Sequence, residues 1–358
     1  AAKLQDDGTG AIWAIGTGIG KPSVALSEVG WTPENGLCMP QLTAKKYQLT
    51  FIAGVTMKVD DINFKFFHIN KWDNGEFKGD AISTTSELVK ISSDGNLGLE
   101  EGQKFERGGI YRFTVDVTKG NTKAVLTVEK VGKVDLPAPD IFFGNDKMEV
   151  TDTDIYKSDQ AFTQGQMITV TGIDNLNEWW IDPDFFEKQS DGALKFLPIN
   201  GDYRVTANAV LKYFSVMALK DGKPAKLQDD GTGAIWAIGK GIGKPSVASS
   251  EVGWEPGKAL CLAQVAPKKY QLTLKAGETL KTSGDWEAIS FKFFYQNDWG
   301  DEFKNYASNT LVEQLKLTDS GNLEMQDNKA FEEGAVYRFT IDVTNGNANA
   351  DLKVEKIN

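Results

Sequence analysis

The chain has 358 residues, is 41% hydrophobic and carries a formal net charge of −11. This length exceeds one ordinary domain and predicts two or three. The acidic balance, with no offsetting cluster of Lys or Arg, argues against nucleic acid as a partner. No apolar run approaches the roughly 20 residues that a transmembrane helix needs. The opening residues lack the basic and apolar regions of a signal peptide, so we expect any such peptide to lie outside this chain.

An internal repeat organises the chain. Residues 2–24 and 225–247 differ only at Thr17, which is Lys240 in the second copy. The correspondence continues to about residue 130 in the first copy and to about residue 356 in the second. The sequence therefore predicts three domains, which are residues 1–133, residues 134–224 and residues 225–358.

Strand patterns fill both copies. Residues 47–54 (YQLTFIAG) and 111–118 (YRFTVDVT) alternate apolar and polar side chains with period two. The Lys-Gly-Asn that follows the second segment is typical of a hairpin turn. Residues 309–317 form the segment closest to a helical pattern, and they could be a short helix or an irregular strand. We predict an all-β protein of tandem sandwiches, immunoglobulin-like or carbohydrate-binding-module-like, with roughly seven to nine strands in each copy.

The middle segment, residues 134–224, differs from the copies that flank it. Pro137 and Pro139 predict a stiff linker at its start, and Asp221-Gly222 predicts a turn at its end. We expect a smaller β module or an immunoglobulin-like spacer. Because this segment leads directly into the second copy, we also expect a segment of the same kind ahead of the first copy in the natural protein.

The cysteines and the histidine argue against repeated catalytic or metal sites. Cys38 and Cys261 occupy equivalent positions, so neither can form a disulfide within its own copy, and we expect each to be a small buried residue. His68, the one histidine, is Tyr295 in the second copy. A zinc site or Ser-His-Asp triad in each copy is therefore excluded, and we predict no metal and no cofactor.

The Gly-rich stretch at residues 16–23 superficially resembles a phosphate-binding loop. Its spacing is wrong, and Pro22 stands where that motif needs Ser or Thr. We expect its glycines to adopt positive φ in a loop that passes close to a sheet edge.

An aromatic and basic constellation occurs in both copies. Each copy has a Trp that ends a Gly-rich loop, a Lys within an F-K-F-F strand and a Trp in the polar loop after that strand. An indole packs on the C–H face of a pyranose, and nearby charged or amide groups can bind the hydroxyls. The alternative is that these Trp cap the ends of the sandwiches and the Lys are merely solvated. The residues are Trp31, Lys65 and Trp72 in the first copy, and Trp254, Lys292 and Trp299 in the second.

Three other Trp have different contexts. Trp13 and Trp236 lie in apolar strands and are expected in the core. Trp286 has no counterpart in the first copy. It either extends the second aromatic surface or is incidentally exposed.

The middle segment contains a run of aromatic and acidic residues at 179–187 (WWIDPDFFE). A glycosidase needs two opposed carboxyls roughly 5–9.5 Å apart on separate elements. Here Asp182, Asp184 and Glu187 are crowded on one short loop. We favour a structural aromatic corner, with a second sugar-binding surface and catalysis as the alternatives.

The order of these features resembles the tandem modules of SusE- and SusF-type surface glycan-binding lipoproteins of Bacteroidetes. Each copy has a strand that ends in Ile-Gly, a loop that ends in Gly-Trp, the F-K-F-F strand with its loop Trp, a turn that contains Asn96 or Asn322, and a closing hairpin that begins Tyr-Arg-Phe-Thr. The resemblance covers both copies, whereas the middle segment departs from it.

This resemblance implies a lipid-anchored protein on the surface of the outer membrane, with the anchor outside this chain. It implies binding of polysaccharide or oligosaccharide beside a TonB-dependent transporter, without catalysis. The glycan would be starch, another glucan or a hemicellulose. By position, the implied carbohydrate-binding residues are Trp31, Lys65, Trp72 and Asn96 in the first copy, and Trp254, Lys292, Trp299 and Asn322 in the second.

The sequence is thus interpreted as a non-catalytic protein that captures polysaccharide for uptake. One alternative is a glycoside hydrolase or lyase that uses Asp182, Asp184 and Glu187. The other is an adhesin whose loop Trp bind another protein.

Overall fold

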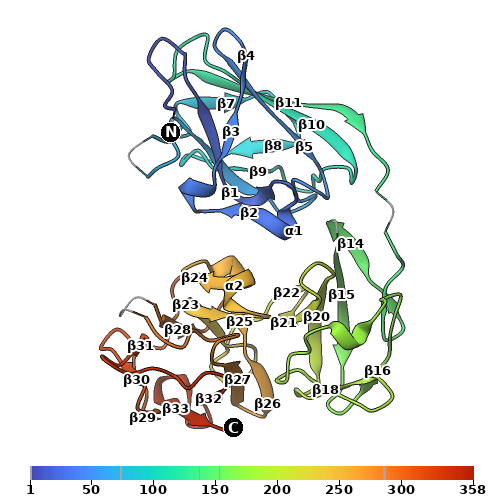
Figure 1. Cartoon of the computed structure of the whole chain (residues 1–358), viewed down its shortest axis with the longest axis vertical. Coiled ribbons are helices and arrows are strands. Elements are labelled where there is room, and N and C mark those ends of the chain that lie inside the picture. Colours follow the sequence, from blue (N-terminus) through green and yellow to red (C-terminus); the bar gives the residue numbers. More distant parts are fainter. Residues whose placement is uncertain (1, 73–74, 137, 153, 285–287) are drawn as a thin grey trace. The chain divides into compact units, whose positions relative to one another are not determined.

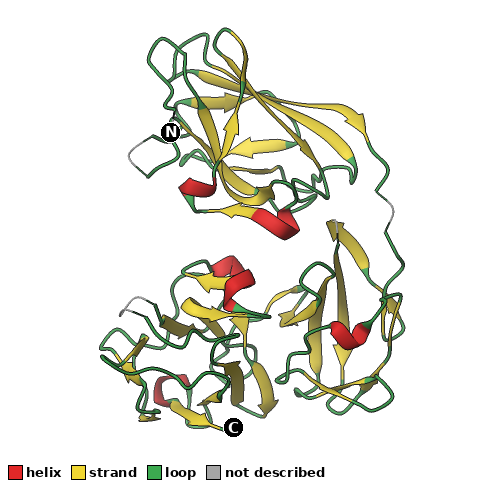
Figure 2. Ribbon diagram, in the orientation of Figure 1, coloured by secondary structure: helices red, strands yellow, loops and turns green. Residues whose placement is uncertain are grey.

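The computed structural model describes residues 2–358 except 73–74, 137, 153 and 285–287. It divides into two compact units, Ala1–Ala138 with Glu149–Tyr156, and Pro139–Met148 with Lys157–Asn358. Strands make up nearly all of the regular structure (Figures 1 and 2), which confirms the predicted all-β class with tandem domains. The described helices are short: α1 is Val24–Ser27, α2 is Val247–Ser250, and 3-10 turns are η1 Pro33–Asn35, η2 Leu176–Glu178, η3 Pro256–Lys258 and η4 Asn347–Asn349. Within the described residues, no helix has the length and apolar character needed to cross a membrane.

We call the first copy, the middle segment and the second copy of the repeat the first, middle and second modules. The first module packs two sheets. One has the order β2-β1-β6-β9-β8 with β3 beside β1, and the other has the order β4-β5-β10-β11-β7. All their pairings are antiparallel except that of β7 with β11. The strands are β1 Ile12–Gly20, β2 Glu28–Gly30, β3 Leu37–Met39, β4 Gln41–Thr43, β5 Lys46–Ile52, β6 Asn63–Phe67, β7 Ile82–Thr84, β8 Val89–Ile91, β9 Leu97–Leu99, β10 Gly109–Asp116 and β11 Ala124–Lys133.

Aromatic side chains from both sheets fill the core of this module. Alternation along β10 buries Tyr111, Phe113 and Val115. The Phe51 ring meets Phe113 edge-on at 5.4 Å and Phe64 at 6.2 Å between centroids. Burying a side chain of this size contributes about 1.5–3 kcal/mol, so these rings hold β5, β6 and β10 together.

Gly16 lets β1 and β6 approach closely. Its φ is +140°, and a Cβ placed there would lie 2.4 Å from Cα of Phe64. Gly239 in the second copy has φ +142° and the same relation to Phe291, at 2.3 Å. The predicted positive φ is confirmed, but the expected loop is wrong at this position, because Gly16 lies inside strand β1.

The second module repeats this topology, with sheets β24-β23-β28-β31-β30 (β25 beside β23) and β26-β27-β32-β33-β29. The segment at 309–317 contributes to β29 and β30, so the short-helix alternative is wrong. The strands are β23 Trp236–Gly243, β24 Glu251–Gly253, β25 Leu260–Cys261, β26 Ala263–Ala266, β27 Lys269–Lys275, β28 Ser290–Phe294, β29 Ser308–Thr310, β30 Leu315–Leu317, β31 Leu323–Met325, β32 Val336–Asp342 and β33 Asp351–Lys356.

The middle module contains one five-stranded sheet, β14-β15-β20-β21-β22, and the three-stranded sheets β13-β12-β17 and β16-β19-β18. Its interior is aromatic, with Phe143 5.2 Å from Phe214 and 5.6 Å from Phe186 between centroids. The strands are β12 Phe142–Phe143, β13 Asp146–Lys147, β14 Glu149–Asp152, β15 Ile155–Phe162, β16 Met167–Ile168, β17 Val170–Thr171, β18 Phe186–Lys188, β19 Leu194–Phe196, β20 Gly201–Asn208, β21 Tyr213–Lys220 and β22 Lys223–Pro224.

Candidate functional site

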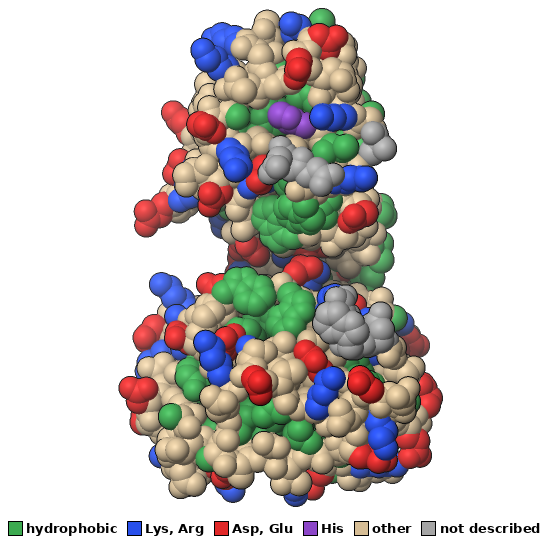
Figure 3. Space-filling view, turned by 90° about the vertical axis from the view of Figure 1, so that its left-hand side faces the viewer, with side chains coloured by type: hydrophobic (Ala, Val, Ile, Leu, Met, Phe, Trp, Pro, Cys, Tyr) green, Lys and Arg blue, Asp and Glu red, His purple; other side chains and the backbone are tan. Residues whose placement is uncertain are grey.

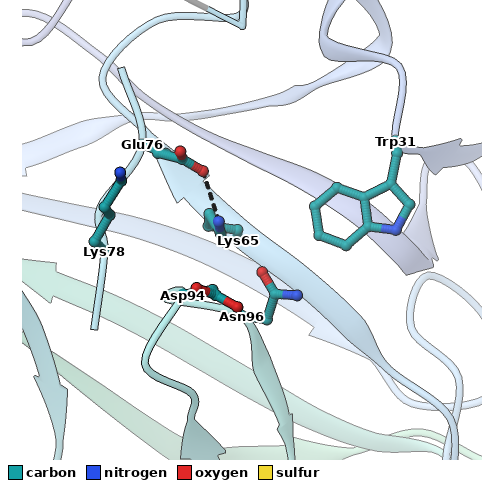
Figure 4. Close-up of a pocket in the computed structure, with 6 residues that line it drawn as sticks. All are labelled: Trp31, Lys65, Glu76, Lys78, Asp94 and Asn96. Carbon is teal, nitrogen blue, oxygen red and sulfur yellow. Dashed lines mark hydrogen bonds and ion pairs between the residues drawn. The ribbon is translucent and has the colours of Figure 1, made fainter. Parts of the chain in front are cut away.

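A recess of about 420 Å³ opens on the first module. Trp31, which directly follows β2, stands on one side of it, across from Lys65 of β6 and from Asn96 in the turn before β9 (Figure 4). Strands β2, β6 and β9 belong to one sheet, which brings these distant residues together. The full lining is Trp31, Lys65, Glu76, Lys78, Asp94 and Asn96.

Lys65 is held at the floor of the recess by an ion pair. Its neighbours Phe64 and Phe66 point into the core, so period-two alternation turns Lys65 to the opposite face of β6. Lys65 is only 8% exposed, and its Nζ lies 2.6 Å from Oε2 of Glu76. A cation this buried requires a partner. Lys65 is therefore not the freely solvated strand lysine that the alternative expected.

The two Trp of the first module stack on each other. The ring centroids of Trp31 and Trp72 are 6.4 Å apart, and the planes meet at 28°. Trp72 is 57% exposed, yet the buried ring of Phe67 supports it edge-on at 5.5 Å. The exposed indole thus packs against two other rings and leaves much of its surface open to solvent.

The second module reproduces this arrangement. Trp254 and Trp299 stack at 6.3 Å and 25°, and Phe294 supports Trp299 edge-on at 6.1 Å. Trp299 is 52% exposed. Lys292 is 6% exposed, and its Nζ lies 3.1 Å from Oε2 of Glu302. Figure 3 shows hydrophobic side chains gathered at the surface of each repeat module.

Asn96 and Asn322 occupy matching turns. The backbone N–H of Asn96 donates to the Ser92 hydroxyl at 3.1 Å, and that of Asn322 donates to the Thr318 hydroxyl at 3.0 Å. Both Asn are half-buried at the start of the strand that pairs with the F-K-F-F strand. We call the Trp pair, the Lys–Glu pair and the Asn of each repeat its platform.

One contact distinguishes the second platform from the first. The buried side chain of Gln296 donates from Nε2 to the carbonyl oxygen of Trp299 at 2.7 Å. The equivalent residue in the first copy is Ile69, which has no amide to offer. The loop that carries the second exposed Trp therefore has an additional anchor.

Sequence reasoning missed the acidic partner in each platform. Glu76 and Glu302 bind the buried lysines, and Lys78 lies beside Glu76 in the recess. Both copies have Glu-Phe-Lys shortly after the loop Trp, as residues 76–78 and 302–304. That shared tripeptide was the available signal.

Other predicted positions have mixed outcomes. Trp236 is 1% exposed, which confirms a core position, whereas Trp13 is half-buried and packs against the core from its edge. Trp286 lies outside the described residues. Cys261 is buried as expected, but the expectation for Cys38 is wrong because it is exposed.

The acidic loop of the middle module is structural. Asp182 and Asp184 are 4% and 1% exposed, and both bind Nζ of Lys244, at 2.7 and 3.1 Å. They face one lysine and not each other across a cleft, so they do not form the opposed pair that glycoside hydrolysis needs. Glu187 lies apart, in an exposed pair with Lys195 at 3.2 Å. This supports the expected structural corner.

The tryptophans of this corner also make structural contacts. Trp179 stacks on Phe214 at 4.7 Å and 28°. Trp180 donates from Nε1 to Glu278 of the second module at 2.8 Å. The corner therefore joins the middle and second modules within one compact unit.

Comparison with known proteins gives family assignments for all three modules. The model described as domain of unknown function DUF5121 matches residues 7–118 and 230–344, together more than half of the chain. The model described as domain of unknown function DUF5125 matches residues 134–227. No curated protein matches the chain. The chain therefore belongs to the DUF5121 family, with two DUF5121 domains in tandem around a DUF5125 domain.

Proposed function

We propose that this protein binds polysaccharide or oligosaccharide through its two platforms and performs no chemistry on the ligand. The observation that carries the proposal is the repetition of one surface arrangement, an exposed Trp stacked on a second Trp beside a buried Lys–Glu pair, in both repeats. The two copies differ elsewhere on their surfaces, for example at Leu26 and Ser249.

The chemistry of the platform suits a sugar. The apolar face of a pyranose packs on an exposed indole, and its hydroxyls need hydrogen-bond partners around the rim. Lys65, Glu76 and Asn96 supply cationic, anionic and amide groups beside Trp31. Because Lys65 and Glu76 are already paired and largely fixed, little side-chain freedom would be lost on binding.

The same composition disfavours the two alternatives. A protein-binding hot spot is an apolar, desolvated centre, whereas this recess has one aromatic and five polar residues in its lining. A hydrolase built on the middle module would need Asp182 and Asp184 accessible, but both are buried against Lys244.

Two weak sites on one chain can capture a long polymer. An open, shallow platform is expected to bind with an affinity on the order of millimolar to micromolar. If both platforms engage one polysaccharide, the second binding event becomes intramolecular, and avidity can exceed the single-site affinity by about 10²-fold or more.

The ligand class and setting rest on the resemblance to surface glycan-binding lipoproteins. Starch, another glucan or a hemicellulose is the proposed ligand. The proposed setting is the outer-membrane surface beside a TonB-dependent transporter, with a lipid anchor outside this chain.

Affinity gel electrophoresis tests this function. We expect a panel of α-glucans, β-glucans and hemicelluloses to include at least one that retards the chain. The double variant Trp72→Ala with Trp299→Ala should then migrate without retardation. Met167→Ala, which removes an exposed hydrophobic side chain from the middle module, is the matched control and should be retarded normally.

Unchanged retardation of the double Trp variant would show that the platforms are not the binding sites. Release of reducing sugar from the retarding polysaccharide would instead favour a hydrolase. A protein partner captured without any glycan retardation would favour the adhesin.

A further inference from the structure

The middle module docks on the second module through its acidic loop. Asp182 accepts from Nζ of Lys244 at 2.7 Å, and Asp184 accepts from it at 3.1 Å. Asp184 also accepts from Nε2 of Gln271 at 2.7 Å, and from the backbone N–H and the hydroxyl of Thr273, both at 2.6 Å. One ammonium group and three further donors thus satisfy two carboxylates.

This contact is buried and specific. Lys244, Asp182 and Asp184 are all less than 5% exposed. Charges removed from water are tolerated only where geometry and additional hydrogen bonds compensate for the lost hydration. Lys244, Gln271 and Thr273 therefore form a receptor whose chemistry fits an Asp-x-Asp loop.

The first module carries the same receptor. Lys21, Gln48 and Thr50 stand at the positions of Lys244, Gln271 and Thr273, in the same register of the repeat and on the same elements. All three residue types are identical. Thr50 and Lys21 are nevertheless exposed, whereas Thr273 and Lys244 are buried.

Two neighbouring positions repeat this difference. Cys38 and Gln41 are exposed in the first module, whereas their identical counterparts Cys261 and Gln264 are 6% and 7% exposed. Strand β25, which contains Cys261, contacts strand β21 of the middle module. The covering module, and not the local sequence, accounts for the difference.

We propose that Lys21, Gln48 and Thr50 form a docking surface for the Asp-x-Asp loop of a further module of the middle type, joined to the N-terminal side of the first module.

Three observations support this occupant. The receptor is cationic with amide and hydroxyl donors, so an acidic loop is complementary. In the second repeat, the docked module leads directly into its receptor module through Pro224 and Ala225, and Ala2 is the counterpart of Ala225. A second copy of this chain is a poor occupant, because its own Asp182 and Asp184 are already buried.

One receptor position differs and predicts a feature of the occupant. Glu278 accepts a hydrogen bond from Trp180, but its counterpart in the first module is Val55. Val55 cannot accept this bond. We therefore expect the further module to carry an apolar residue without an indole N–H at the position of Trp180.

The two cysteines provide a direct test. The tested chain is the full chain with residues 134–224 placed a second time ahead of Ala2, which reproduces the junction of the second repeat. The added copy carries Trp180→Phe, because Val55 cannot accept the hydrogen bond that Glu278 accepts from Trp180. In the unextended native chain we expect a thiol reagent to label Cys38 and to spare Cys261, because burial raises the pKa of the Cys261 thiol to about 12. In the extended chain, labelling of Cys38 should slow by about tenfold or more.

Two variants test whether protection of Cys38 requires the contact between the acidic loop and Lys21, or only the presence of an attached module. Asp182→Asn with Asp184→Asn in the added module should restore fast labelling of Cys38. Lys21→Met in the extended chain should do the same, and this change lies outside the added module and cannot impair its folding. Labelling of Cys38 at equal rates in the extended and unextended chains would overturn the proposal. Protection that persists in both variants would overturn it as well.

Discussion

The two repeats are nearly identical at their platforms, but at another surface the equivalent side chains are exposed in the first repeat and buried in the second. Their platforms agree to within 0.1 Å in the distance between stacked Trp rings, 6.4 and 6.3 Å. Their lysines after the Gly-rich stretch differ completely, since Lys21 is exposed and Lys244 is buried between two aspartates. The platform depends only on residues of its own module, whereas the lysine surface depends on what docks against it.

The pKa values of these two lysines follow the same division. Lys21 is exposed as a residue, but its Nζ lies 5.9 Å over the ring of Phe51, and desolvation of the ammonium group lowers its pKa. Burial would lower the pKa of Lys244 as well, but Asp182 and Asp184 raise it above its ordinary value. The pKa values of two lysines in the same local sequence are thus shifted in opposite directions.

Lys244→Met should lower the stability of the protein much more than Lys21→Met, and this is the largest effect that we expect. It leaves Asp182 and Asp184 buried without their cation, and breaking such a group costs about 3–5 kcal/mol. Lys21→Met should cost less than about 1 kcal/mol, because no buried carboxylate loses a partner. Calorimetric melting of the two single variants compares them, and equal losses of stability would break the proposed asymmetry.

Gly16→Ala and Gly239→Ala, unlike the two lysine variants, should lower the stability of their copies by similar amounts. Each glycine has positive φ and no room for a Cβ beside the Phe of the neighbouring strand. Strain of this kind costs about 1–3 kcal/mol, and the steric clash adds to it. Denaturant unfolding is the measurement. A neutral effect in either copy would contradict the close approach of the two strands.

Lys65→Met and Lys292→Met should affect ligand binding more than stability. Each removes a group that lies beside the Trp pair, and a hydrogen bond to a charged group is worth about 1.5–3 kcal/mol. We expect the affinity of the altered module to fall about tenfold or more. Lys90→Met, at an exposed strand position, is the matched control. An unchanged affinity would show that these lysines do not contribute to ligand binding.

Gln296→Ala should have the smallest effect, confined to the second platform. It removes the side-chain hydrogen bond to the Trp299 backbone, a contact worth about 0.5–1.5 kcal/mol. The affinity of the second module should fall by a few fold, while that of the first module stays unchanged. Ile69→Ala, the equivalent change in the first copy, is the control and should leave the affinity of the first module unchanged, because Ile69 has no amide to lose. An effect on both modules would mean that Gln296 acts through something other than its own loop.

Much of the fold could be predicted from the sequence. The near-identity of residues 2–24 and 225–247 revealed the repeat, and period-two alternation identified the strands. The same alternation correctly turned Lys65 away from Phe64 and Phe66. These features depend on local sequence, which is why they could be predicted.

The contacts that complete each site were not predictable in the same way. The pairing of Lys65 with Glu76 depends on how the loop after β6 returns to the sheet. The burial of Cys261 and exposure of Cys38 depend on a neighbouring module. Local patterns carry no information on such long-range packing, and identical sequences therefore led to one correct and one wrong expectation.

Calorimetric titration with an oligosaccharide of the retarding glycan tests the central claim most directly. The ligand should be too short to span two sites. We expect two binding sites on the unaltered chain, one on Trp72→Ala, one on Trp299→Ala, and none on the double variant. An undiminished stoichiometry in the double variant would contradict glycan binding at the platforms, because the exposed indoles would then have no part in binding.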